Sequence, residues 1–269
     1  MNYRTIKVQT DGPVGTIRLN RPERMNAVNE EMYSELQDAL GRFLNDSGVR
    51  CLILTGSVLE RDGIKKQAFC AGADLKKHAA GERNQAQREE YIRLAHETTR
   101  IIYTFPKPVI AAVNGPARGA GAEMALSCDF LLMAEEATLG FPETGLGTFV
   151  GGGVTHILPR LIGLAKAKEL IYTGRIIDGR TAVQFGLAFE CCPVPNLFDE
   201  ANVLALKIAG KGPISIVLAK DLLQRSPGLD INEALEMETN AILTCMNSED
   251  WQEGLLAFSE KRSPIFVGN

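Results

Sequence analysis

Hydrophobic and polar positions along the first third of the chain follow two different periods. Residues 5–10 and 14–19 alternate apolar and polar side chains on either side of a short turn, which is typical of a β-hairpin. From Met32 to Phe43 the apolar residues recur at helical spacing, and Asn29 precedes them as a candidate N-cap. A short apolar run at 51–55 predicts another strand. This order of elements predicts an α/β sheet covered by helices.

The pattern becomes mainly helical in the second half. The polar segment 57–67 is expected to be a surface loop, a helix is expected from about Arg88 to Tyr103, and the apolar run 109–113 predicts a buried strand. Further helices are expected at 154–161, 164–172, 179–185, 197–209, 214–224, 231–246 and 249–261. We therefore expect an α/β core over residues 1–195 and a helical, oligomer-forming region over residues 196–269.

Composition excludes several classes of protein. The 269 residues carry a net charge of -4, which argues against a general nucleic-acid binder. No apolar run approaches the ~20 residues that span a bilayer, and the N-terminus lacks the pattern of a signal or transit peptide. The cysteines form no C-x-x-C pair, so no metal site is indicated and free thiols in the cytoplasm are expected.

One stretch combines features of an active site. The expected strand at 109–113 leads into Val113–Asp129, where small residues at 119–122 precede a short apolar helix that contains Glu123. Small residues allow close approach to the backbone, and free N–H groups at a helix start favour an anionic group. A tight turn with an acid that complements the helix dipole would explain the same residues. A second small-residue segment, 68–75, has similar properties.

Five segments in order resemble the crotonase family, also called the enoyl-CoA hydratase/isomerase superfamily. They are Leu19–Ala27, Ala68–Lys76, Val113–Asp129, Gly140–Glu143 and Phe258–Pro264. The resemblance implies a crotonase-like spiral of β-β-α units with a C-terminal helical region. It also implies homotrimers, often paired into hexamers, and an acyl-CoA thioester as the ligand. No further cofactor is expected, because coenzyme A is part of the substrate.

The resemblance also implies roles for individual residues. The backbone N–H groups of Ala73 and Ala120 would hold the thioester oxygen as negative charge develops on it. Glu123 and Glu143 match the two catalytic glutamates of the hydratase branch. We expect Glu123 to activate the water that adds at C3 and Glu143 to protonate C2. Two close carboxyl groups in a dry pocket would share a proton.

The binding residues follow from the same motifs. The expected substrate-binding positions are Arg24, Ala27, Ala71, Asp74, Leu75, Lys76, Gly151 and Lys261. Gly151 would donate an N–H to the catalytic water, and Lys261 would reach the CoA phosphates, with a neighbouring subunit as one possible source. A solvated surface charge is the alternative interpretation of Arg24 and Lys261.

The expected function is reversible hydration of a 2-enoyl-CoA. The alternatives are an enoyl-CoA isomerase, a thioester hydrolase, a hydratase of a cyclic acyl-CoA, and a noncatalytic relative. The chain departs from the family's common pattern at Arg118, at Ala120 within Gly119–Gly121, in the longer segment 57–67 and at 149–156, and these departures concern the acyl substrate. The histidines at 78, 96 and 156 lack metal-ligand spacing and are expected to be ordinary surface or partly buried residues.

Overall fold

The computed structural model describes residues 3–61, 64–74 and 83–269. Its main sheet, in the described residues, has the strand order β1-β2-β3-β6-β8-β11. The strands are β1 (Ile6–Asp11), β2 (Val14–Leu19), β3 (Cys51–Gly56), β6 (Val109–Val113), β8 (Phe130–Ala134) and β11 (Glu190–Cys192). β1 and β2 form the expected antiparallel hairpin, and the remaining neighbours pair in parallel. Because β3 and β6 are covered on both faces, all their residues are buried.

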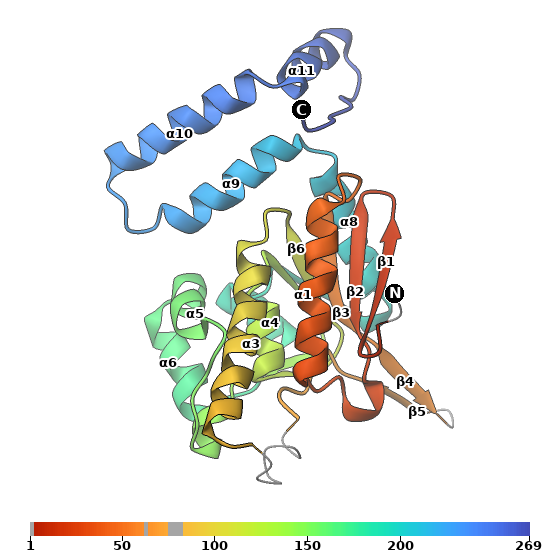
Figure 1. Cartoon of the computed structure of the whole chain (residues 1–269), viewed down its shortest axis with the longest axis vertical. Coiled ribbons are helices and arrows are strands. Elements are labelled where there is room, and N and C mark those ends of the chain that lie inside the picture. Colours follow the sequence, from red (N-terminus) through yellow and green to blue (C-terminus); the bar gives the residue numbers. More distant parts are fainter. Residues whose placement is uncertain (1–2, 62–63, 75–82) are drawn as a thin grey trace.

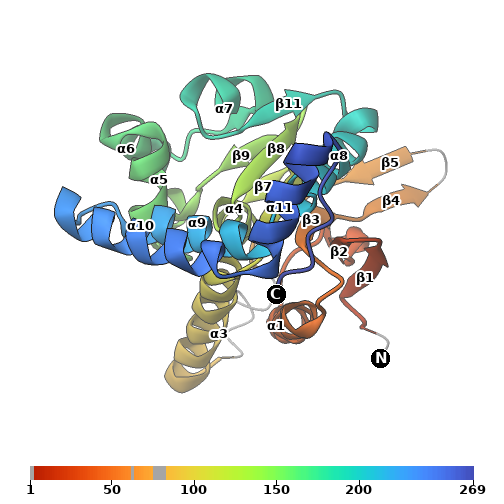
Figure 2. The same cartoon turned by 90° about the horizontal axis from the view of Figure 1, so that it is seen from above.

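Helices cover both faces of this sheet. α1 (Glu30–Asn45), α3 (Gln85–Thr104) and α4 (Ala120–Leu126) lie on one side, and α8 (Leu197–Ala209) lies on the other (Figures 1 and 2). Asn29 caps α1 as expected, since its side chain accepts a 3.0 Å hydrogen bond from the Met32 N–H. The α/β sheet covered by helices that the order of elements predicted is thus confirmed.

A second, smaller sheet lies beside the first. It consists of β7 (Ala117–Arg118), β9 (Thr138–Gly140) and β10 (Ile177–Asp178), with β9 in the centre. β7 is too short to give a periodic signal and was not expected from the sequence. The chain continues through η2 (Glu143–Leu146), α5 (Val154–Ile162), α6 (Leu164–Thr173) and α7 (Gly179–Phe185). This arrangement places the start of α4 between the two sheets.

The expectation of a loop at 57–67 was wrong. Residues of this segment form an antiparallel hairpin of β4 (Val58–Arg61) and β5 (Ile64–Gln67). The hairpin projects from the body of the protein (Figure 1). A projecting ribbon has solvent on both faces, so polar residues occupy both and the period of two disappears.

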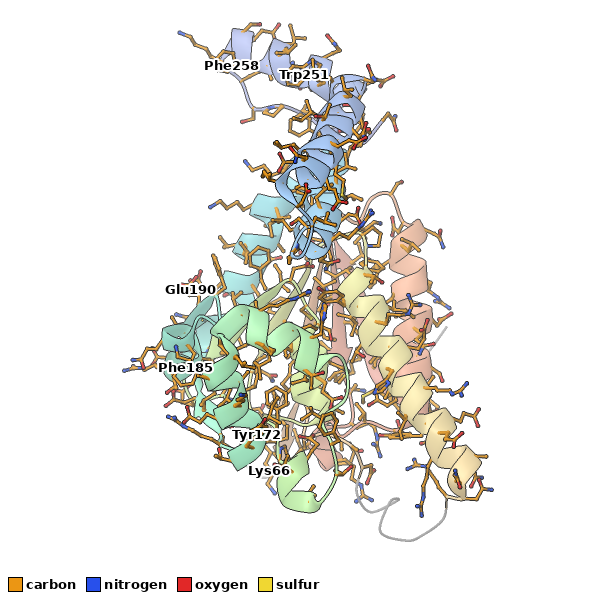
Figure 3. All side chains as sticks on the ribbon, turned by 90° about the vertical axis from the view of Figure 1, so that its left-hand side faces the viewer. Lys66, Tyr172, Phe185, Glu190, Trp251 and Phe258 are labelled. Carbon is orange, nitrogen blue, oxygen red and sulfur yellow. The ribbon has the colours of Figure 1, made fainter. Side chains whose placement is uncertain are left out.

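The expected C-terminal region is divided by its packing. α8 lies against the main sheet and buries Leu197, Ala201, Ala205 and Ala209. The following helices, α9 (Pro213–Arg225), α10 (Ile231–Met246) and α11 (Glu249–Glu260), form an arm that leaves the core (Figure 1). Figure 3 shows Trp251 and Phe258 at the far end of this arm, where their residues are 40% and 86% exposed.

Other general properties concern the membrane, metals and thiols. Among the described residues no single helix is long and apolar enough to cross a membrane, although the helices of 194–209 and 213–225 together reach that length across a 106° bend. The same residues contain no group of three or more His, Cys, Asp or Glu side chains arranged to hold a metal ion. All six cysteines are free thiols.

A partly buried ion pair fastens the arm to the core. Lys220 on α9 is 2.7 Å from Asp129, which also accepts a 2.8 Å hydrogen bond from the Val109 N–H at the start of β6. Gln224, one turn further along α9, donates to the carbonyl of Tyr103 at 2.7 Å. The first helix of the arm is therefore held by polar contacts to two core elements.

We predict that Lys220→Met lowers the free energy of unfolding by about 2 kcal/mol, because it leaves the partly buried Asp129 carboxylate without its cation. Urea unfolding followed by circular dichroism measures this loss. Lys207→Met, on the exposed side of α8, is the matched control and should change stability by less than about 0.5 kcal/mol. Similar small losses in both variants would contradict the assignment of Lys220 as an anchor.

Candidate active site

The turn between β7 and α4 depends on two glycines. Gly119 has φ 48° and ψ −120°, a conformation that L side chains rarely adopt, and a Cβ there would clash with Glu143 Oε1. A Cβ on Gly121 would clash with the carbonyl oxygen of Cys70. The small residues thus have a packing role as well as the expected site role, because two other segments lie directly against them.

The segment around Cys70 runs alongside this turn. The Cys70 N–H donates to the Pro116 carbonyl at 3.1 Å, and the Arg118 N–H donates to the Cys70 carbonyl at 3.0 Å. A Cβ built on Gly72, which has φ 96°, would lie 3.9 Å from the Ala120 nitrogen. The structure therefore brings together the two segments that contain the expected oxyanion-hole donors.

The N–H groups of Ala73 and Ala120 are both available. Within the described part of the chain, neither donates a hydrogen bond to a backbone or side-chain acceptor. Ala120 is the first residue of α4, where an N–H has no partner inside the helix. Two free donors on adjacent backbone segments form a suitable site for a developing oxyanion.

Glu123 is a buried acid on α4. Its residue is 7% exposed, and its Oε1 accepts a 2.7 Å hydrogen bond from the Gly151 N–H. Burial raises the pKa of Glu123 to about 7, the nearby charge of Glu143 raises it too, and the Gly151 hydrogen bond opposes both. A carboxyl group with this pKa can both accept and release a proton near neutral pH.

The structure revises the expected contact of Gly151. Its N–H was expected to face the catalytic water, whereas it donates directly to the Glu123 carboxyl group. Gly152, with φ 59°, lies against the same side chain, since a Cβ there would be 2.7 Å from the Glu123 Cβ. The 151–152 backbone thus fixes the acid in place.

Glu143 approaches the same turn from the other side. It is the first residue of η2, its Oε1 lies over Gly119, and burial raises its pKa. Its Oε2 is buried without a hydrogen-bond partner among the described residues. A buried carboxyl oxygen without a partner is costly unless the group is protonated or a ligand supplies the hydrogen bond.

Four of the expected CoA-binding residues lie on two neighbouring segments of the chain. Ala27, Ala71 and Asp74 lie together, because the segments 25–28 and 71–74 exchange backbone hydrogen bonds of 2.9 to 3.1 Å, including one from the Ala71 N–H. Asp74 also pairs with Arg21 at 3.1 Å. Arg24 is exposed on the neighbouring η1 (Pro22–Arg24).

Three of the expected binding residues remain, and the structure describes one of them. Leu75 and Lys76 lie outside the described residues. Lys261 ends α11 on the arm, and Figure 1 shows α11 beyond α9, away from α4. The structure of one chain therefore does not bring Lys261 to the two acids.

Two residues near the site had no clear signal in the sequence. Asn26 is fully buried with φ 56°, and its amide donates to the carbonyls of Ser57 and Ala68 at 3.0 and 2.8 Å. Asparagine tolerates this left-handed conformation, which is the only hint in the sequence. His96, which was expected to be an ordinary histidine, lies beside Gly151, where a Cβ would be 3.1 Å from its Nε2.

Arg118 does not bring a charge into the turn. Its guanidinium donates to the carbonyl and the hydroxyl oxygen of Thr138 at 2.7 Å each, so it ties β7 to β9. The departure at this position therefore supports the small sheet rather than altering the pocket.

Comparison with known proteins identifies the family. A sequence profile described as "Enoyl-CoA hydratase/isomerase" matches residues 9–269. The chain belongs to this family. The crotonyl-CoA hydratase of Syntrophomonas wolfei is 36% identical over 269 residues, which is 99% of each chain. The short-chain-enoyl-CoA hydratase of Clostridium acetobutylicum is 35% identical over 262 residues, 97% of each chain.

Solved structures of the family agree with the fold. The crystal structure of an enoyl-CoA hydratase from Bacillus anthracis superimposes with a TM-score of 0.92 at 40% identity, covering 99% of this chain and 100% of that one. The crotonase-like fold with its C-terminal helical region, inferred from five motifs, is thus confirmed.

We predict a pH-dependent stabilisation by Glu123→Gln. Because the pKa of Glu123 is about 7 in the folded protein, above the ordinary 4.5, the folded state loses stability as pH rises from the lower value to the higher. The variant should therefore be more stable than the native protein by about 1–3 kcal/mol at about pH 8.5 and nearly equal to it at about pH 5. Thermal unfolding at both pH values measures the difference. A native protein that is the more stable one at the higher pH would contradict the raised pKa.

Proposed function

We propose that the protein is a 2-enoyl-CoA hydratase that adds water reversibly across the conjugated double bond. The observation that carries the proposal is the pair of acids at one glycine turn. Glu123 and Glu143 come from different elements, both have raised pKa values, and Glu143 Oε2 has no partner among the described residues. The similarity to named enoyl-CoA hydratases over the whole chain supports the same reaction.

The geometry suggests how each group takes part. The thioester oxygen would accept hydrogen bonds from the N–H groups of Ala73 and Ala120, which stabilises the enolate-like state by about 3–4 kcal/mol per donor. Glu123 would take a proton from water as the oxygen bonds to C3. Glu143 would give its proton to C2, so that a molecule of water is added in total.

The bound substrate would cross the two small-residue segments. The CoA portion would lie along the 24–28 and 71–74 segments, with Leu75 and Lys76 as further proposed contacts. At the acyl end, three exposed apolar residues lie within four positions of site residues in the sequence. They are Ile92, Leu146 and Phe149, which are 49%, 60% and 69% exposed. An acyl chain would cover apolar surface of this kind.

The alternative functions do not need both Glu123 and Glu143 in the way that hydration does. Shifting a double bond moves a proton from one carbon to another and needs one acid, while thioester hydrolysis directs water at C1. A noncatalytic binder would keep one buried and one half-buried acid that lower its stability without using them. Hydration needs both a base for water and an acid for carbon, which favours the first proposal.

We further propose that the protein assembles into trimers or dimers of trimers. α10 buries none of its residues in one chain, and Ile231, Leu235 and Ile242 follow one stripe of that helix with 69%, 51% and 58% exposure. A second copy of this chain would cover the stripe, and its Lys261 would then be a candidate for the CoA phosphates. The six free thiols are consistent with the proposed cytoplasmic location, where thiols stay reduced.

We predict that Glu143→Gln lowers kcat for crotonyl-CoA hydration by about 10³-fold, because the amide cannot protonate C2, while KM changes less than about threefold. Loss of the conjugated enoyl-thioester absorbance measures the rate. Glu136→Gln, an exposed acid without a role at the site, should keep native activity. Turnover of crotonyl-CoA by Glu143→Gln at the native rate would overturn the role of this acid.

We predict that Leu235→Lys with Ile242→Lys dissociates the assembly, because two charges would enter the proposed apolar interface. Sedimentation should give at least three times the 29.3 kDa chain mass for the native protein and a smaller species for the variant. Glu236→Lys, an adjacent exposed position outside the stripe, is the control. A native protein that sediments as a single chain would contradict the proposed assembly.

A further inference from the structure

His96 on α3 borders the same open space as the catalytic acid. A Cβ built on Gly151 would lie 3.1 Å from His96 Nε2 and 3.3 Å from Glu123 Oε2. The two atoms are thus separated by no more than the sum of these distances. Because Gly151 has no side chain, nothing from that residue fills the space between the imidazole and the carboxyl group.

The hydrogen bonds of the two side chains leave these atoms available. Glu123 Oε1 accepts the Gly151 N–H, whereas Oε2 accepts no hydrogen bond from a described residue. The His96 ring likewise has no hydrogen-bond partner within the described part of the chain. A Cβ lies closer to its own Cα than a water can, so a water that bridges the two atoms would lie farther from the Gly151 backbone than this point.

We propose that His96 is a positioning residue for the hydration reaction: its Nε2–H donates to one water, which in turn donates to Oε2 of Glu123. The inference rests on the proposed function. Gly151 then holds one carboxyl oxygen and the imidazole holds the other through water, so the base keeps a fixed orientation toward the substrate. A group that donates to the carboxylate also favours its charged form.

Few of the other ionisable groups around Glu123 can change its pKa near neutral pH. Tyr33 on α1 and Cys70 face the acid, but burial raises the pKa of Tyr33 well above 10 and that of Cys70 to about 12, so both are neutral near pH 7. The nearby charge of Glu143 disfavours the ionised form of Glu123. His96 is the group that would favour the ionised form of Glu123.

Five other ionisable residues lie near His96 along α3 or lie on α5. They are Arg93, Glu97, Arg100, His156 and Arg160. Glu97 pairs with Arg100 on the same helix. His156 contacts Arg160 and stacks edge-on against Tyr103 with 6.5 Å between ring centroids. His156 is therefore a matched control: a second histidine near α3 with contacts of its own.

The test compares His96→Phe, His96→Gln and His156→Phe with the native protein. Phenylalanine keeps the ring and removes the donor, while glutamine places an amide N–H near the position of Nε2. The titration of the Glu123 carboxyl group is followed by NMR in protein labelled with ¹³C-glutamate, and its resonance is assigned with Glu123→Gln. The second readout is kcat and KM for crotonyl-CoA.

We expect His96→Phe to raise the pKa of Glu123 by about 0.5–1, because the carboxylate loses its water-mediated donor. It should also lower kcat about tenfold with KM within about twofold of native. His96→Gln should restore most of both values, and His156→Phe should leave both unchanged.

A Glu123 titration and kcat in His96→Phe equal to those of the native protein would overturn the proposal. A rise in KM alone would also overturn it, since that result would assign His96 to acyl-chain binding. The NMR titration requires no turnover. Failure of the native protein to hydrate crotonyl-CoA would therefore count against the proposed function, whereas an unchanged titration would count against the role of His96.

Discussion

The close approach of two backbone segments at a glycine turn determines the rest of the site. The 70–73 segment lies so near the start of α4 that a side chain on Gly121 would clash with the Cys70 carbonyl. This contact brings together the two segments that carry the free N–H groups of Ala73 and Ala120. It depends on the small sheet, because Arg118 fastens β7 to β9 through Thr138. A larger residue at the turn would separate the donors before it changed the overall fold.

Burial of two carboxyl groups against this turn provides the second constraint. Gly119 leaves room for Glu143, and the 151–152 backbone encloses Glu123. Removing both acids from water raises their pKa values, which reduces stability and prepares them for proton transfer near neutral pH. Burial of the carboxyl groups therefore produces both the raised pKa values and the loss of stability.

Much of this organisation could be predicted from residues with strong local signals. The hairpin of β1 and β2 followed from alternation, and the start of α1 followed from Asn29. The two acids and the two alanines were identified through motif resemblance. The structure brings the glutamates to one turn and leaves the alanine N–H groups without described partners. Their catalytic roles stay predictions.

Other features lacked a readable signal for physical reasons. None of the side chains described in β4 and β5 is buried, so the pattern of this hairpin resembles a loop. β7 has two residues and is defined by pairing with β9. His96 acquires its significance from Gly151, 55 positions later in the sequence, and spacing within α3 cannot show such a contact. In the proposed assembly the contact of Lys261 with CoA would come from a second copy, and the pattern of a single chain does not describe such a contact.

In the proposed reaction water adds to C3 and a proton adds to C2 while the thioester stays intact. Mass spectrometry of the products formed from crotonyl-CoA in ¹⁸O-labelled heavy water tests it most directly. The account predicts 3-hydroxybutyryl-CoA with ¹⁸O at C3 and deuterium at C2. Label in a free carboxylate would identify a thioester hydrolase, and deuterium exchange without ¹⁸O would identify an isomerase; either result would contradict the account.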